Sequence, residues 1–206
     1  MGRYRGPRLR IIRRLGCPIP GLMQTSETLK RPYAPGYFNR KKRKKKDSEY
    51  ALRLKEKQKL RYHYGLTEHQ ISRYVNRAFA SRINPGLFLL IDLESRLDNV
   101  VFRSGFARSI AAARQMIRHG HFLVNNYRAN FPSYKISVGD LIEIKTNSSI
   151  RVLVNSNIKG QTQIPCPQYL ATNKELLKIQ ISSLPIREDI PVSCNEKLII
   201  EYYSGK

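Results

Sequence analysis

One predicted helix carries four side chains that could bind a polyanion. Residues 110–119 form an Ala-rich stretch in which Arg114 and Arg118 are four positions apart and so share a face. Gln115 and His119 lie one position round from them. Guanidinium groups bind phosphates bidentately and stack on bases. The pattern indicates a cationic, hydrogen-bonding ridge, although the same spacing also fits a solvated helix face.

The residues that could ligate a metal do not form a complete set. Cys17, Cys166 and Cys194 include no CxxC pair, which excludes a zinc ribbon or finger and favours a reducing compartment. His119 and His121 could form a metal pair, but no third ligand follows at a suitable spacing. Neither a glycine-rich phosphate loop nor a Ser/His/Asp pattern occurs. We therefore predict no catalytic residue, no metal and no cofactor.

The charge of the chain points to an anionic partner. The 206 residues carry a formal charge of +23, and residues 1–46 hold 15 Lys and Arg against one acid, Glu27. Nucleic acid is the first candidate partner and an anionic membrane surface the second. Hydrophobic residues make up 41% of the chain, which is enough for a core. The run Arg40–Lys46 indicates phosphate neutralisation, with a localisation signal or a solvated tail as the alternative.

The middle of the chain predicts a small helical bundle over residues 48–97. Asp47 or Ser48 can cap a helix that runs to about residue 64, and Thr67 begins a capping box. The proline- and glycine-rich residues 1–46 predict an extended segment, because such a stretch buries little apolar surface.

Residues 94–158 predict two short helices and a small antiparallel sheet. Asp98 can cap the first helix, and residues 110–119 form the second. Asn125-Asn126 predicts a tight turn between strands 122–124 and 127–129, and residues 141–144 predict a third strand. We expect residues 159–206 to pack on the helical domain, with 198–203 as a strand or extended tail.

Several stretches resemble a known family. RLDNVVFRSGFA, ARQMIRHGHFLVN and PSYKISVGD are similar to the alpha-L RNA-binding domain of small-subunit ribosomal protein four, heat-shock RNA-binding proteins, some tyrosyl-tRNA synthetases and pseudouridine synthases. The ribosomal version is the most similar. RYRGPRLRIIRRLG near the start and IPVSCNEKLIIEYYS near the end also resemble that family, so the resemblance covers nearly the whole chain.

The resemblance implies an α+β protein with four regions. They are an extended basic rRNA-binding N-terminal segment, a helical domain, an alpha-L RNA-binding domain with two helices packed on a small antiparallel sheet, and a C-terminal segment packing on the helical domain: 1–46, 47–93, 94–158 and 159–206. Many bacterial members have a zinc-binding cysteine cluster near the N-terminus, whereas this chain has only Cys17 there.

The implied function is that of a structural constituent of the small ribosomal subunit. Such a protein binds the 5′ domain of the 16S-type rRNA directly, nucleates assembly of the subunit body and contributes to translational accuracy. Its implied partners are small-subunit proteins five, twelve and three, with messenger RNA close by and no membrane. We expect it in the plastid stroma, or in the bacterial cytoplasm as the alternative. Residues 1–16 have no apolar core of signal-peptide length, so we expect a mature N-terminus.

Two other functions are weaker alternatives. A free-standing binder of ribosomal RNA would share the RNA-binding domain, but the flanking similarity favours the ribosomal protein. Pseudouridine synthases use an aspartate in a string like Arg96-Leu97-Asp98, but in a separate domain, and helix capping explains Asp98 here. We therefore expect no enzyme activity. The expected rRNA-binding residues are Arg3, Tyr4, Arg5, Arg8, Arg10, Arg13, Arg14, Arg40, Lys41, Lys42, Arg43, Lys44, Lys45, Lys46, Arg61, Arg96, Arg103, Arg108, Arg114, Gln115, Arg118, His119 and His121.

Overall fold

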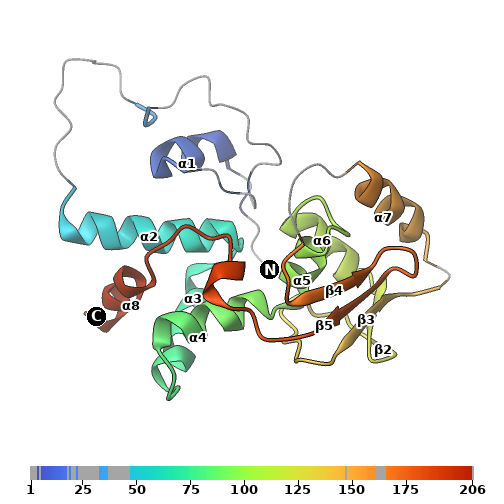
Figure 1. Ribbon diagram of the computed structural model, residues 1–206. Helices are drawn as coiled ribbons and strands as arrows, with labels where there is room; N and C mark the ends of the chain where they lie inside the picture. The colour runs from blue at the N-terminus through green and yellow to red at the C-terminus, as the bar shows by residue number, and fades with distance from the viewer. Residues whose placement is uncertain are drawn as a thin grey trace. The chain divides into compact units, whose positions relative to one another are not determined.

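The computed structural model forms two compact units (Figure 1). One contains Met1–Leu87 with Val192–Lys206, and the other contains Phe88–Pro191. The structure describes residues 4, 6–17, 19, 22, 33–36, 47–146, 148–160 and 166–205. These residues include helices and an antiparallel sheet, so the predicted α+β class is confirmed.

The first unit is helical in its described part. Its α2 (Glu49–His63) packs against α1 (Arg8–Leu15) and α8 (Glu196–Ser204), and α8 also contacts α3 (Glu68–Phe79). The division between the units falls inside α4 (Pro85–Glu94). Segments from both ends of the chain therefore build one helical core.

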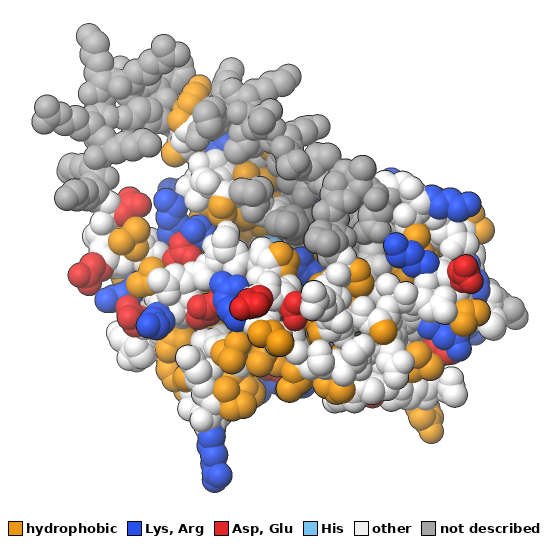
Figure 2. Space-filling model, in the orientation of Figure 1, with side chains coloured by type: hydrophobic (Ala, Val, Ile, Leu, Met, Phe, Trp, Pro, Cys, Tyr) orange, Lys and Arg blue, Asp and Glu red, His pale blue; other side chains and the backbone are white. Residues whose placement is uncertain are grey.

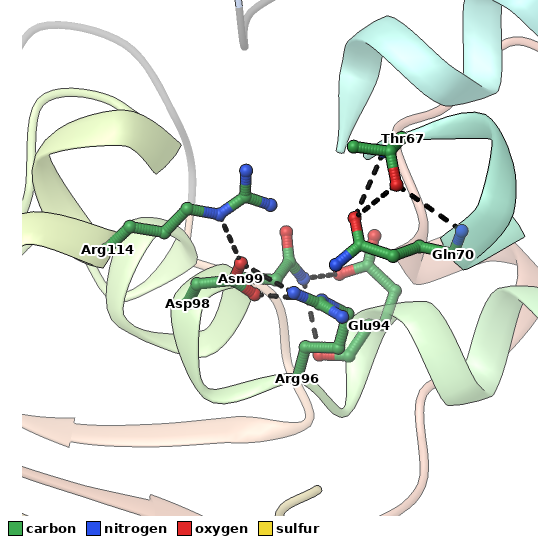
Figure 3. Close-up of polar contacts among 7 residues, drawn as sticks. All are labelled: Thr67, Gln70, Glu94, Arg96, Asp98, Asn99 and Arg114. Atoms are coloured by element: carbon green, nitrogen blue, oxygen red, sulfur yellow. Dashed lines mark hydrogen bonds and ion pairs between the residues drawn. The ribbon is translucent and has the colours of Figure 1, made fainter. Parts of the chain in front are cut away.

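Local capping places the helix starts where the sequence predicts them. Ser48 accepts a hydrogen bond from the Ala51 N–H at the start of α2. Thr67 and Gln70 form the capping box that begins α3, as Figure 3 shows. Each cap satisfies backbone N–H groups that have no partner inside the helix. The predicted starts of both helices are confirmed.

The N-terminal region contains a helix, which corrects the extended segment expected over residues 1–46. Pro7 stands at the N-cap of α1, where its missing N–H is not needed. Gly16, with φ 71°, ends the helix, and its N–H bonds to Ile12 O at 2.8 Å. Ile12 and Leu15 are buried, so this apolar face explains why the segment folds.

The C-terminal residues form α8 instead of the expected strand or extended tail over 198–203. Ile199 and Tyr202 are three positions apart, and both are buried. The adjacent Tyr203 hydroxyl donates to Glu68 Oε1 at 2.8 Å, and Glu68 also pairs with the buried Lys57 at 2.8 Å. These contacts with α2 and α3 are distant in sequence, and they select the helix.

The second unit contains a five-stranded antiparallel sheet in the order β2-β1-β3-β5-β4. The strands are β1 (Phe122–Val124), β2 (Tyr127–Arg128), β3 (Leu141–Ile144), β4 (Leu170–Asn173) and β5 (Lys178–Ile181). Asn125 and Asn126 have φ of 49° and 68°, as the predicted tight turn requires. The two central predicted helices are α5 (Leu97–Arg103) and α6 (Ile110–Arg118), which pack against each other.

One apolar core joins the helices of this unit to its sheet. Buried side chains from α5, α6, α7 (Ile150–Lys159) and four strands form a single cluster. Phe122 and Ile142 are 0% exposed within it. Figure 1 shows the helices on one side of the strands. The sheet thereby fixes the position of α6, which carries the predicted ridge.

The structure divides residues 159–206 between the units, which differs from the single packed segment expected. Strand β5 pairs with β3, with Ile142 opposite Ile179, so residues 170–181 complete the sheet. Leu177, Ile179 and Ile181 are all buried, and this alternation explains the strand. A 3₁₀ turn, Arg187–Asp189, follows, and only the residues from Val192 onward join the helical unit.

Candidate nucleic-acid interface

Packing of one face of α6 into the core determines which of its side chains are exposed. Ser109 accepts from the Ala112 N–H at 3.2 Å and starts the helix. Ala113, Met116 and Ile117 are buried in the core, so Gln115, Arg118 and His119 remain exposed. Three of the four predicted ridge residues therefore lie on an accessible surface of the second unit.

Arg114 has a different environment from Arg118. Its Nε lies 2.7 Å from Asp98 Oδ2, and its side chain is 19% exposed (Figure 3). Arg96 approaches the same carboxylate with two hydrogen bonds of 3.0 and 2.9 Å. Asp98 was expected to cap α5, but the N-cap is Arg96 and no side chain caps this helix. The guanidinium groups of Arg96 and Arg114 bind the Asp98 carboxylate, so it is not available to cap the helix.

A second buried polar cluster lies beside α5. Glu94 is 0% exposed and pairs with Arg103 at 3.1 Å. The Tyr169 hydroxyl donates to Glu94 at 2.9 Å, and the Asn99 amide also donates to this carboxylate. Burial and then the Glu94 charge raise the pKa of Tyr169, so the hydroxyl stays protonated as a donor. This cluster is part of the core.

The burial of Arg96 and Arg103 changes their expected role. Both were expected to contact rRNA, but their side chains are 2% and 1% exposed and are held by carboxylates. Buried charges need such partners because an isolated ion is poorly solvated inside a protein. These two residues serve the fold of the second unit, and we leave them out of the proposed interface. Arg108 is exposed, and its Nε bonds to Asn157 at 2.9 Å.

The two histidines lie close together at the end of α6. The ring centroids of His119 and His121 are 5.9 Å apart, and His121 Nδ1 is 2.8 Å from the Ser148 hydroxyl. Arg128, on the neighbouring hairpin, reaches the His119 carbonyl with an N–H at 3.5 Å. Sequence reasoning missed Arg128. No sequence signal marked it, because its approach to Gly120 depends on how the hairpin packs against the end of α6.

The first unit adds cations and aromatic rings around α1 and α2. The rings of Tyr4 and Tyr62 meet edge to face at 5.6 Å, and Arg61 lies over Tyr62 at 5.4 Å. A cavity of about 570 Å³ lies between the two helices, with Arg14 and Arg61 in its lining. The other expected residues of α1 are Arg8 and Arg10, which are exposed, and Arg13, which lies over Tyr33. The remaining predicted contacts, Arg3, Arg5 and Arg40–Lys46, lie outside the described residues.

The exposed charge is not gathered into one patch on the face drawn in Figure 2. Over the described residues of that face, Lys and Arg side chains are mixed with acidic and apolar ones.

Within the described part of the chain, no three His, Cys, Asp or Glu side chains are grouped as a metal site. None of the helices described there has the length and apolar character needed to cross a membrane.

Comparison with known proteins agrees with this fold. The protein-family model of the S4 domain matches residues 95–142, and the family model of the ribosomal protein S4/S9 N-terminal domain matches residues 3–94. The fold and the site thus define a protein of the S4-domain class. Neither matching model describes an enzyme.

The relatives specify the family. The chain is 46% identical to small ribosomal subunit protein uS4 of Cyanothece sp. over the full length of both. It is 47% identical to uS4 of Nostoc punctiforme, over 99% of this chain and 98% of the relative. It is 45% identical to uS4c of Cyanophora paradoxa, over 99% of this chain and all of the relative. The chain belongs to the small ribosomal subunit protein uS4 family, and the expected resemblance is confirmed.

Proposed function

We propose that this protein is a structural constituent of the small ribosomal subunit and binds its rRNA directly. The full-length similarity to uS4 proteins carries the proposal. In the second unit, the binding surface comprises Arg118, Gln115, His119 and His121, with Arg114 at its edge. The first unit contributes further rRNA contacts through Arg8, Arg10, Arg14 and Arg61.

The finer roles follow from the same family resemblance. The protein binds the 5′ domain of the 16S-type rRNA early, nucleates the body of the subunit and supports translational accuracy. Its neighbours are small-subunit proteins five, twelve and three, with messenger RNA nearby. Cyanobacterial relatives and the uS4c proteins have similar identities, which supports a plastid or a bacterial ribosome.

A structural role fits the chain better than catalysis. Asp98, the candidate catalytic aspartate, is 1% exposed and lies between two guanidinium groups. An active-site carboxylate must reach its substrate, whereas the Asp98 carboxylate is buried and ion-paired with Arg96 and Arg114. We therefore propose that the protein forms no pseudouridine in rRNA.

Co-sedimentation tests the ribosomal role against a free-standing RNA-binding protein. A ribosomal constituent stays with the small subunit in a sucrose gradient after a high-salt wash. A loosely bound accessory protein is released, because salt weakens phosphate contacts steeply. Complete release of the chain from small subunits, with the other subunit proteins retained, would contradict the proposal.

A further inference from the structure

Arg128 lies against the backbone at the end of α6. The guanidinium group is so close to Gly120 that a Cβ atom there would collide with it. Gly120 also has φ +73°, a conformation that side chains disfavour. The Arg128 N–H that reaches the His119 carbonyl approaches the negative end of the helix. The absence of a side chain at Gly120 thus leaves room for this exposed cation beside the helix end.

Arg128 supplies a fixed positive charge close to two histidine rings. The His119 and His121 rings are 5.9 Å apart, and the Ser148 hydroxyl bonds to His121 Nδ1. Burial and then the neighbouring His119 and Arg128 lower the pKa of His121. The ring therefore resists protonation while no anion is present.

The surrounding elements supply further cations. Arg118 projects from α6, and Lys145, whose N–H donates to the His121 carbonyl, follows β3. The nearest acid along β3 is Glu143, which pairs with Lys178 at 2.5 Å. Among the described residues, no carboxylate forms an ion pair with His119, His121 or Arg128. This arrangement suits an anion supplied from outside the chain.

We propose that His119, His121 and Arg128 form a binding site for one phosphodiester group of RNA, and that the phosphate binds together with a proton. The inference rests on the proposed function, because it names the group bound at one point of that interface. A phosphate accepts hydrogen bonds from both an arginine and a protonated imidazole. Gln115 and Arg118, which are exposed on the adjoining α6, can contact the same nucleic-acid strand, which favours a phosphate within RNA over free phosphate.

The test measures binding of the full chain to a 5′-domain rRNA transcript at pH 7.5 and 5.5 over a salt series. We expect tighter binding at pH 5.5. In His119→Gln/His121→Gln, the ratio of the two affinities should fall toward one. Titration of the RNA itself is common to both proteins and cancels in this comparison. An equal pH ratio for wild type and the double variant, with both proteins folded, would overturn the inference.

Arg128→Gln tests the third member of the site. We expect a loss of affinity of about tenfold or more, as for a charged hydrogen bond. The log K against log[salt] slope should flatten by about 0.7–0.9, the value for one phosphate. Lys174→Gln is the matched control, because Lys174 is an exposed cation between β4 and β5, at the opposite edge of the sheet from β2. Equal effects of the two variants would contradict the assignment.

NMR of the histidine rings separates this inference from the proposed function. The His121 pKa should rise when the transcript binds, and inorganic phosphate alone should produce a much smaller change. An equal response to inorganic phosphate would indicate a general anion site and overturn the RNA assignment. Failure of wild-type protein to bind the transcript at either pH would instead contradict the proposed function itself.

Discussion

Two pairs of arginines in the same unit have opposite environments. Arg96 and Arg103 are at most 2% exposed, and each is held by a buried carboxylate. Arg118 and Arg128 are exposed, and no described carboxylate pairs with either. Side-chain type alone does not distinguish these pairs. The comparison shows that part of the large positive charge supports folding and cannot be counted as phosphate contacts.

Arg114 is intermediate between the two pairs. It binds the buried Asp98, yet its side chain retains 19% exposure at the edge of the α6 ridge. A single guanidinium has five N–H donors, so it can hold Asp98 and still present donors to a phosphate. Arg114 therefore connects the folded core to the proposed interface.

The largest expected effect is on stability, from Arg103→Ala. The substitution leaves Glu94 buried without its ion-pair partner, which should cost about 3–5 kcal/mol of unfolding free energy. Urea denaturation measures the change, with Arg118→Ala as the exposed control, for which we expect a shift within about 0.5 kcal/mol. Equal stability of the two variants would remove the distinction between buried and exposed arginines.

Arg118→Ala should show the reverse behaviour. We expect rRNA affinity to fall by about 1.5–3 kcal/mol, the range for a charged hydrogen bond, while the fold is retained. Filter binding of the 5′-domain transcript measures the loss, and circular dichroism checks the fold. Lys174→Ala is a charge-matched control that should bind as wild type does. Wild-type affinity in Arg118→Ala would exclude this residue from the interface.

Arg114→Ala should affect both properties. Asp98 keeps Arg96 as a partner, so we expect a stability loss of about 1–2 kcal/mol, smaller than that of Arg103→Ala. Affinity should also fall, by less than in Arg118→Ala. Measuring both quantities on one preparation tests whether the residue is shared. A loss in only one of them would assign Arg114 wholly to the core or wholly to the interface.

The smallest effect concerns pH and the free protein. His121 has a lowered pKa in the folded state, so the native protein binds fewer protons there than the unfolded chain. The unfolding free energy should therefore decrease as pH falls through the ordinary histidine range near about 6.5. His121→Gln should reduce this decrease between pH 7.5 and 5.5 in urea titrations. A steeper decrease of the unfolding free energy in His121→Gln than in the wild type would contradict this prediction.

The sequence by itself determined the features that depend on neighbouring residues. Thr67 and Gln70 are three positions apart, so their capping box forms from local geometry. Ser109 starts α6 by the same logic, and Asn125-Asn126 turns the chain because asparagine tolerates positive φ. The motifs that resemble the S4 domain are also contiguous. Such features need little knowledge of the rest of the fold.

Only the tertiary structure decided which cations are accessible and where the C-terminal residues belong. Glu94 and Tyr169 are 75 residues apart, yet they meet beside Arg103 and form its buried site. Strand β5 joins β3 through distant pairing, and α8 folds against α2. Burial and charge pairing arise from chain segments brought together by folding, so residue type and local spacing do not reveal them.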